Sequence, residues 1–364
     1  MTTNLSKQKT SGLYKNRAPR TLASGAGILF GAAALTNALW FSPNVTAYAT
    51  AKSEPTVVIG YENNGPDPEM VAIAKDYFSK YMHAKVEMKL FTSGPAALTA
   101  LGSGSLQFMT GIGNPPAMSA MAQGVPLQVI WAQEMYTKDE GLAVKKTSGI
   151  KSVKDLKGKT VALVLGSTSP LELDTALKNA GVPASSVHLL NMSPPAMQAA
   201  WTNNQIQAAY VWDPVFASLL KEKGEAIMYD ANVKNQAPIF NLTVVNTKWA
   251  ASHESLVEGF IQAQAAGVSF YQHHREAAIG LMAKEAGISV AMAKIEAAGF
   301  QFDTPVMQLG HLGMGSGATV KNSLVTKSLE AAAKYLMSSN TITSIPAHID
   351  AFVNPMYVEK YLKK

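Results

Sequence analysis

Hydrophobic and polar residues follow alternating strand-like and helix-like periods from residue 56 to about residue 275. The clearest example runs from Ser193 to Gly224. Ser193 precedes Pro194-Pro195 and predicts a helix start, because a serine accepts from free N–H groups and proline needs no partner in the first turn. Residues 206–212 alternate like a strand, and Asp213-Pro214 begins a second helix that ends at Gly224. Helix, strand and helix in succession indicate an α/β protein.

The same alternation recurs before and after this stretch. It predicts strands at residues 56–61, 85–91, 106–109, 127–132, 141–145, 187–190 and 241–246, and a buried strand around residues 160–162. Helices are predicted between these strands, and a longer helix is predicted over residues 254–275. The pattern begins again after residue 145. We therefore predict two mostly parallel, doubly wound α/β units.

The first fifty residues have a different pattern, which predicts a secretory signal. Basic residues between Lys7 and Arg20 precede a weakly charged apolar run from Leu22 to Phe41, and Ala47-Tyr48-Ala49 follows. This is the order of the basic, apolar and cleavage regions of a signal peptide. We expect residues 1–51 to be removed after Ala49 or Ala51, which would leave the mature protein in the periplasm. A retained membrane anchor of about twenty residues is the alternative.

The formal charge of +6 comes mostly from this leader. It holds five of the 31 Lys and Arg residues and none of the 25 acidic residues, which leaves 26 basic against 25 acidic groups in the remainder. A nearly neutral chain gives no support to binding of nucleic acid or of an anionic membrane surface. The chain has no cysteine, which excludes disulfides and thiol chemistry. These features are typical of a diffusible carrier, and we expect a monomer.

Four predicted helix starts are candidate anion sites, because the free N–H groups of a first turn point to one spot. They are Ser93-Gly94, Asn114-Pro115, Ser167-Thr168-Ser169 and Ser193. Each can equally be an ordinary helix cap, and the sequence leaves both interpretations open. We retain Ser93, Asn114, Ser167 and Thr168 as candidate ligand-binding residues.

Acidic and aromatic residues at predicted strand ends are candidates for binding a positively charged group. Trp212 and Asp213 end the strand at 206–212, at the edge where open α/β sheets bind ligands. Glu62 follows the first strand, and Glu140 precedes the strand at 141–145. Asp213 has the alternative role of a helix cap, and Trp201 suits a core position better than a binding site.

The sequence offers no catalytic motif. The seven histidines form no HExxH and no metal-binding cluster, and His273-His274 is a poor chelate because the two side chains point in different directions on a helix. No GxSxG, P-loop or GxGxxG motif stands between a predicted strand and a helix. We expect neither enzymatic activity nor a cofactor or metal ion.

Two motifs resemble a known family. The motif PPAxxAAW at residues 194–201 and the motif AYVWDP at residues 209–214 resemble the taurine-binding periplasmic proteins of ABC importers. Related binders of aliphatic sulfonates and nitrate carry similar stretches. The resemblance covers most of residues 55–340. Ser93 and Ser167-Thr168 match hydroxyl-lined helix starts that hold the sulfonate in this family. Glu140 stands at a position where the family pattern also has an acidic residue.

This resemblance implies the type II periplasmic binding protein fold, in which two doubly wound α/β lobes are joined by two hinge strands. The expected division gives residues 52–147 and 241–364 to the first lobe, including C-terminal helices, and residues 148–240 to the second. The implied function is capture of a small sulfonate, taurine or a taurine derivative, and its delivery to an ABC permease in the inner membrane.

Three departures from the family pattern leave the ligand open. Asn241 stands where the family has an aspartate that binds the amine of taurine, and Pro115 removes an N–H that could face a sulfonate. Glu62 stands where an uncharged polar residue is more usual. A derivative with a capped nitrogen, or a different solute such as a betaine, nitrate or a thiamine precursor, is therefore an alternative. An exported enzyme on the same fold and a sensor for a membrane kinase are alternatives from other classes.

Overall fold

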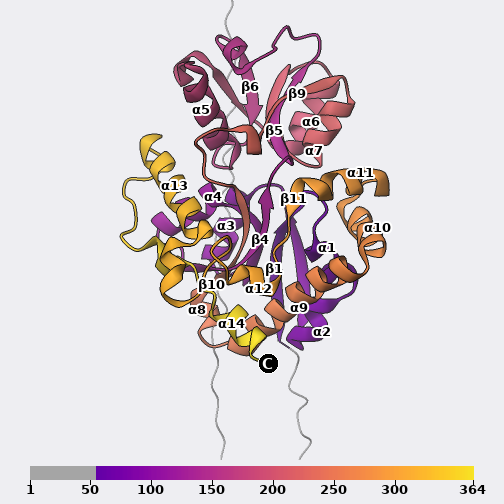
Figure 1. Cartoon of the computed structure of the whole chain (residues 1–364), viewed down its shortest axis with the longest axis vertical. Coiled ribbons are helices and arrows are strands. Elements are labelled where there is room, and N and C mark those ends of the chain that lie inside the picture. The colour runs from indigo at the N-terminus through magenta and orange to yellow at the C-terminus, as the bar shows by residue number, and fades with distance from the viewer. Residues whose placement is uncertain (1–54) are drawn as a thin grey trace, which may run out of the picture. The chain divides into compact units, whose positions relative to one another are not determined.

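The computed structural model describes residues 55–364, which form two β-sheets with helices packed around them (Figure 1). The predicted signal peptide and its cleavage positions lie outside these residues. Within residues 55–364, no helix combines the length and the apolar character needed to cross a membrane.

The first sheet has six strands in the order β11-β4-β10-β3-β1-β2. β1 pairs in parallel with β2 and β3, whereas β10 is antiparallel to both β3 and β4. Its strands are β1 (Thr56–Glu62), β2 (Lys85–Phe91), β3 (Phe108–Gly113), β4 (Leu127–Tyr136), β10 (Phe240–Asn246) and β11 (Phe300–Gln301). The helices of this part are α1 (Pro68–Ala74), α2 (Tyr77–Met82), α3 (Gly94–Gly102), α4 (Asn114–Ala122), α8 (Thr247–Ala250), α9 (Glu254–His273), α10 (Arg275–Ala286), α11 (Val290–Glu296), α12 (Pro305–Gln308), α13 (Leu324–Ser338) and α14 (Met356–Leu362).

The second sheet has five strands in the order β7-β6-β8-β5-β9. β6 pairs in parallel with β7 and β8, and β5 runs antiparallel to β8 and β9. Its strands are β5 (Glu140–Lys145), β6 (Thr160–Leu163), β7 (His188–Asn191), β8 (Ala208–Trp212) and β9 (Gly224–Tyr229), and its helices are α5 (Ser169–Ala180), α6 (Pro194–Thr202) and α7 (Val215–Lys221). The prediction of two doubly wound α/β units is thereby confirmed.

The chain crosses between the sheets twice, in residues 137–139 and again in residues 230–239. We call residues 55–136 and 240–364 lobe I, and residues 140–229 lobe II. The first crossing lies earlier than the predicted boundary at residues 147 and 148, because β5 pairs with β8 and β9 in the second sheet. Every residue of β5 is buried, and an apolar strand of this kind does not reveal from its sequence which sheet it joins.

Local sequence signals account for most element boundaries. Asp67 accepts a hydrogen bond from Met70 N at 3.1 Å and caps α1, while Gly181 ends α5 in the left-handed conformation at φ +69°. Ser193 lies at the predicted N-cap of α6, although its hydroxyl does not cap the helix. Two strands, β9 and β11, are absent from the sequence prediction.

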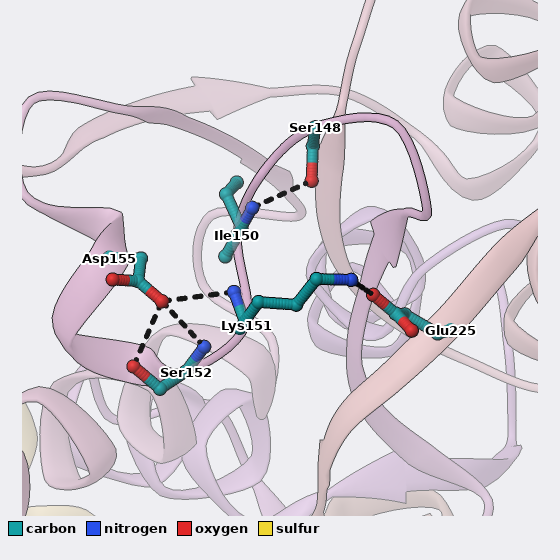
Figure 2. A network of polar contacts seen from close by, with 6 residues as sticks. All are labelled: Ser148, Ile150, Lys151, Ser152, Asp155 and Glu225. Atoms are coloured by element: carbon teal, nitrogen blue, oxygen red, sulfur yellow. Dashed lines mark hydrogen bonds and ion pairs between the residues drawn. The ribbon is translucent and has the colours of Figure 1, made fainter.

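A polar turn fixes the segment that leads from β5 to β6 (Figure 2). Asp155 Oδ2 accepts from Lys151 N at 2.9 Å, Ser152 N at 2.9 Å and Ser152 Oγ at 3.0 Å. Lys151 Nζ also contacts Glu225 Oε1 at 2.7 Å and so reaches β9. These groups are mostly exposed, so the turn directs the chain more than it stabilises the fold.

Each lobe has its own apolar core. In lobe I the rings of Phe108 and Phe260 stack with centroids 4.3 Å apart, which joins β3 to α9. In lobe II, β8 is buried on both faces, with Val211 in the cluster around Trp201 and Tyr210 in the cluster on the other face. Trp201 is fully buried, as its sequence position suggested, and its Nε1 donates to Glu222 O at 3.0 Å.

Candidate functional site

The candidate site lies between the two lobes, where the ends of β1 and β3 in lobe I face the start of α5 and the end of β8 in lobe II. A central cavity of about 20 Å³, room for a group the size of a water molecule, is found here. It is lined by Glu62, Asn64, Gly94, Gly111, Gly113, Pro116, Tyr136, Ser167, Thr168, Trp212 and Asn241. Five of the predicted site residues, Glu62, Ser167, Thr168, Trp212 and Asn241, therefore meet at one cavity.

Glu62 is the charged group that lines the central cavity directly. It ends β1, is only 8% exposed, and its Oε1 has no hydrogen-bond partner. A Cβ atom on Gly94 would lie 3.1 Å from this oxygen, so glycine at the first position of α3 lets the carboxylate approach the helix start. Burial, and then the charge of Glu140, raise the pKa of Glu62 well above its usual range.

Glu140 lies behind the cavity in lobe II, where it binds the start of α5. Its two carboxylate oxygens accept from Thr168 Oγ1 at 2.6 Å and from Ser169 Oγ at 2.5 Å. Burial raises the pKa of Glu140 to about 7, although both hydroxyl donors favour the ionised form. Glu140 therefore positions Thr168 rather than lining the cavity.

Thr168 of lobe II approaches Gly113 of lobe I closely. A Cβ atom on Gly113 would lie 2.5 Å from Thr168 Cγ2, a distance at which two methyl groups cannot coexist. Gly113 has φ −63° and ψ 159°, a conformation open to any residue. Glycine is therefore required at position 113 because lobe II comes so close, and not because of the backbone conformation.

Asn241 reaches the cavity wall, but its amide is already engaged inside lobe I. Asn241 Nδ2 donates to Glu134 Oε1 at 2.5 Å and to Tyr136 OH at 2.8 Å. Burial and the charge of Asp67 raise the pKa of Glu134 well above its usual range. The sequence pattern did not indicate Glu134 and Tyr136 as site residues, because their only signal is that they continue the alternation of the strand predicted at residues 127–132.

The structure does not bring Ser93 or Asn114 to the central cavity. Ser93 is half-buried at the N-cap of α3 and makes no capping hydrogen bond through its side chain. Asn114 is buried, accepts from Phe240 N at 2.8 Å, and donates to Pro238 O at 3.3 Å and to Ser328 Oγ. Asn114 therefore ties α4 to β10 and α13, which is a structural role.

Trp212 and Asp213 lie where the strand-end argument placed them. Trp212 is 6% exposed and lines both the central cavity and a neighbouring chamber. Asp213 Oδ1 accepts from Ala217 N at 2.9 Å, so it does cap the first turn of α7. Burial raises the pKa of Asp213 to about 7 against the effect of this hydrogen bond.

The outer chamber shares Glu62, Asn64 and Trp212 with the central cavity and measures about 170 Å³. Its polar lining comes from Glu62, Asn63, Asn64, Thr92 and Asp213, and the rest of its wall is mainly apolar. The apolar contributions come from Leu90, Phe91, Pro194, Pro195, Trp212, Pro214 and Val215. Among the described residues, no Lys, Arg or His lines either space.

Few backbone donors remain at the helix starts around the cavity. Proline occupies the first or second position of α3, α4 and α5, and α4 carries both Pro115 and Pro116. Each proline removes one N–H group that could bind an anion. An anionic ligand therefore depends on the N–H groups that remain, such as those of Gly94 and Thr168.

Comparisons with known proteins agree with this architecture. A family model described as NMT1/THI5 like matches residues 66–278, more than half of the chain. The taurine-binding periplasmic protein of Escherichia coli strain K12 is 34% identical over 206 residues, which are 56% of this chain and 62% of that protein. The match thus spans less than two thirds of that relative.

Two solved structures share the fold. The alkanesulfonate-binding protein of Xanthomonas axonopodis pv. citri, bound to MOPS, superimposes with a TM-score of 0.69 at 20% identity, over 84% of this chain and 99% of that one. The periplasmic aliphatic sulphonate binding protein of Escherichia coli superimposes with a TM-score of 0.63 at 22% identity, over 80% of this chain and 95% of that one. They confirm the predicted two-lobed periplasmic binding protein fold. With the matching family model, these findings show that the chain belongs to the NMT1/THI5-like family.

Proposed function

We propose that this protein is a solute-binding protein that closes two lobes over a small sulfonate carrying a nitrogen, either taurine or an N-substituted taurine. The observation that carries the proposal is the unpartnered, buried Oε1 of Glu62 in the cavity between the lobes. The name of the taurine-binding relative supports a sulfonate, and it supports binding rather than catalysis.

The proposed binding mode places the nitrogen of the ligand near Glu62. An N–H group of the ligand donates to Glu62 Oε1, which otherwise remains buried without a partner at considerable cost. The sulfonate accepts from the first turn of α5, where Ser167 and Thr168 line the cavity. Because the cavity of about 20 Å³ holds only a water-sized group, the lobes must separate slightly to admit the sulfonate. One end of the ligand then contacts lobe I and the other end lobe II, so binding favours closure.

The outer chamber supports a ligand larger than taurine. Its apolar wall suits an acyl or alkyl substituent, and Glu62, beside which the nitrogen is placed, lines this chamber too. Asn241 does not bind an amine in this proposal, because both hydrogens of its amide are directed to Glu134 and Tyr136. Glu62 takes the role that the family gives to an acid at position 241.

A second candidate function is binding of a cationic solute without a sulfonate. Carboxylates already stand at two helix starts, Glu62 beside Gly94 and Glu140 beside Thr168 and Ser169. They favour a positive group and disfavour a simple anion such as nitrate. A betaine or an amine-bearing thiamine precursor would suit such surroundings.

The cellular setting is part of the proposal. The predicted signal peptide and the relatives named as periplasmic support an exported protein. We propose that the closed form delivers its ligand to an ABC permease in the inner membrane, and that the protein acts as a monomer.

A thermal-shift panel tests the proposal directly. It contains taurine, N-acetyltaurine, isethionate, butanesulfonate, glycine betaine, nitrate and a thiamine precursor. A ligand at 100 times its dissociation constant adds about 2.7 kcal/mol to the free energy of unfolding, which raises the melting temperature visibly. We expect the largest shift with N-acetyltaurine or taurine. A response to betaine alone would favour the second candidate, and silence for the whole panel would contradict both.

Glu62→Gln should lower the affinity for nitrogen-bearing sulfonates about tenfold or more. The substitution keeps the shape of the side chain but replaces a charged acceptor, whose hydrogen bonds contribute about 1.5–3 kcal/mol. Calorimetric titration measures the change in affinity. Isethionate, which lacks nitrogen, is the reference ligand, and its affinity should fall much less. Glu330→Gln, on the exposed face of α13, is the matched control. Equal losses for taurine and isethionate would remove Glu62 from the nitrogen subsite.

A further inference from the structure

A further and larger cavity lies between the lobes; it shares Asp213 with the outer chamber and no residue with the central cavity. It measures about 360 Å³ and is formed by α7 of lobe II, by the segment from Ile295 to Gly299 at the end of α11, and by the crossing at residues 138 and 139. Figure 1 shows α7 beside α11 where the two lobes meet. We call this space the acidic cavity.

Glu296 is the buried and unpartnered group of this cavity. It ends α11, is only 2% exposed, and neither carboxylate oxygen has a hydrogen-bond partner. Burial, and then the charge of Asp213, raise the pKa of Glu296 to about 8. A carboxyl group without any partner is expensive to bury, so this position invites a ligand that donates hydrogen bonds.

Two further carboxylates line the same cavity. Asp139 is 1% exposed and its Oδ1 is also unpartnered, while Asp213 is 5% exposed. Burial, and then the charges of Asp213 and Asp230, raise the pKa of Asp139 to about 9. Among residues 55–364, no ion pair reaches Glu296, Asp139 or Asp213. Lys138, which is exposed, also lines the cavity.

The remaining wall is largely apolar. Phe216, Leu220 and Tyr229 contribute from lobe II, and Ile295 from lobe I. A volume of several hundred cubic ångströms with an apolar wall and a few convergent polar groups is typical of a site for a small organic molecule. Such a molecule needs a positive, hydrogen-donating end and a hydrocarbon body.

We propose that the acidic cavity binds a small primary alkylammonium ion, with its ammonium group at Glu296 and Asp139 and its alkyl chain against Phe216 and Leu220. An ammonium has three donors, which satisfy the free carboxylate oxygens and offset their mutual repulsion. A metal ion is the weaker choice, because within the described residues no three acidic or histidine side chains are arranged to hold one.

Titration calorimetry of the purified protein with n-butylammonium chloride tests this site. We expect one saturable site per chain, with no comparable heat from n-butanol, sodium chloride or calcium chloride. Glu296→Gln should weaken binding at least tenfold without unfolding the protein, because glutamine keeps the shape of the side chain but cannot supply the negative charge that pairs with the ammonium group. Ala217→Leu fills the cavity without changing its charge and should weaken binding as well.

Two controls separate this site from the central cavity. Glu330→Gln removes an exposed carboxylate and should leave the affinity for n-butylammonium unchanged. Glu62→Gln should also leave it unchanged, because Glu62 does not line the acidic cavity. The proposal is overturned if n-butylammonium does not bind saturably, if it binds Glu296→Gln as tightly as the unmodified protein, or if Glu62→Gln alone abolishes binding. Binding of calcium in place of n-butylammonium would also overturn it.

Discussion

Gly113→Ala should nearly abolish ligand binding while the fold survives. The new methyl group would lie 2.5 Å from Thr168 Cγ2, so lobe II could not approach lobe I as it does now. Overpacking of this kind costs about 1–3 kcal/mol, and here the cost falls on the closed form alone because the contact joins the lobes. We expect the affinity for the best ligand of the panel to fall about 100-fold, measured by titration calorimetry.

Thr168→Ser provides the rescue that identifies the cause. Serine lacks the Cγ2 methyl group but keeps the hydroxyl that donates to Glu140. The double variant Gly113→Ala with Thr168→Ser should therefore recover most of the affinity. Gly280→Ala is the matched control, since nothing lies within 4 Å of its new methyl group in α10, and it should leave binding unchanged. Failure of the serine rescue would mean that Gly113 does not limit closure.

Features determined by neighbouring residues could be predicted from the sequence. The cap at Asp67, the glycine stop at Gly181 and the full extent of β2 depend on groups only a few residues apart. Asp213 is a similar case, because its hydrogen bond to Ala217 N spans four residues. In the structure Asp213 caps this turn and also lines the outer chamber, and its role in ligand binding stays a prediction.

Features determined by distant pairing could not be predicted in this way. β9 is an edge strand that pairs only with β5, and its first residue, Gly224, has the sequence signature of a helix end. β11 consists of two residues and pairs with β4, which lies more than 150 residues earlier. The assignment of β5 to lobe II follows from the same long-range pairing.

The candidate site shows the same division between local and distant information. Helix-start chemistry marked Ser167 and Thr168, which line the central cavity, but it also marked Asn114, which does not and whose partners Phe240 and Ser328 are 126 and 214 residues away. Glu62 and Glu140 were both recognised as acidic candidates. Only the structure distinguishes them, because Glu140 has two hydroxyl donors whereas Glu62 Oε1 has no partner.

Asn241→Asp should destabilise the protein by about 3 kcal/mol at pH 8, instead of simply adding an acid to the ligand site. The amide hydrogens that now bind Glu134 Oε1 at 2.5 Å and Tyr136 OH at 2.8 Å would be replaced by a carboxylate oxygen. Two buried carboxyl groups would then face each other, and at least one would have to hold a proton. Urea unfolding of the variant and of the unmodified protein measures the difference.

The pH dependence of this loss identifies its origin. The pKa of Glu134 is already raised by burial and by Asp67, and a second carboxylate would raise it further. A group with a raised pKa in the folded state contributes stability that is present at low pH and is lost as pH rises through that pKa. The destabilisation should therefore be small near pH 4 and grow toward pH 8.

Glu134→Gln in the same chain should remove most of this destabilisation, because the glutamine amide can donate to the new aspartate. Asn322→Asp, at an exposed position, should show neither effect. A loss that is independent of pH would instead point to packing around position 241, and Asn241 would then be a core residue without an electrostatic role.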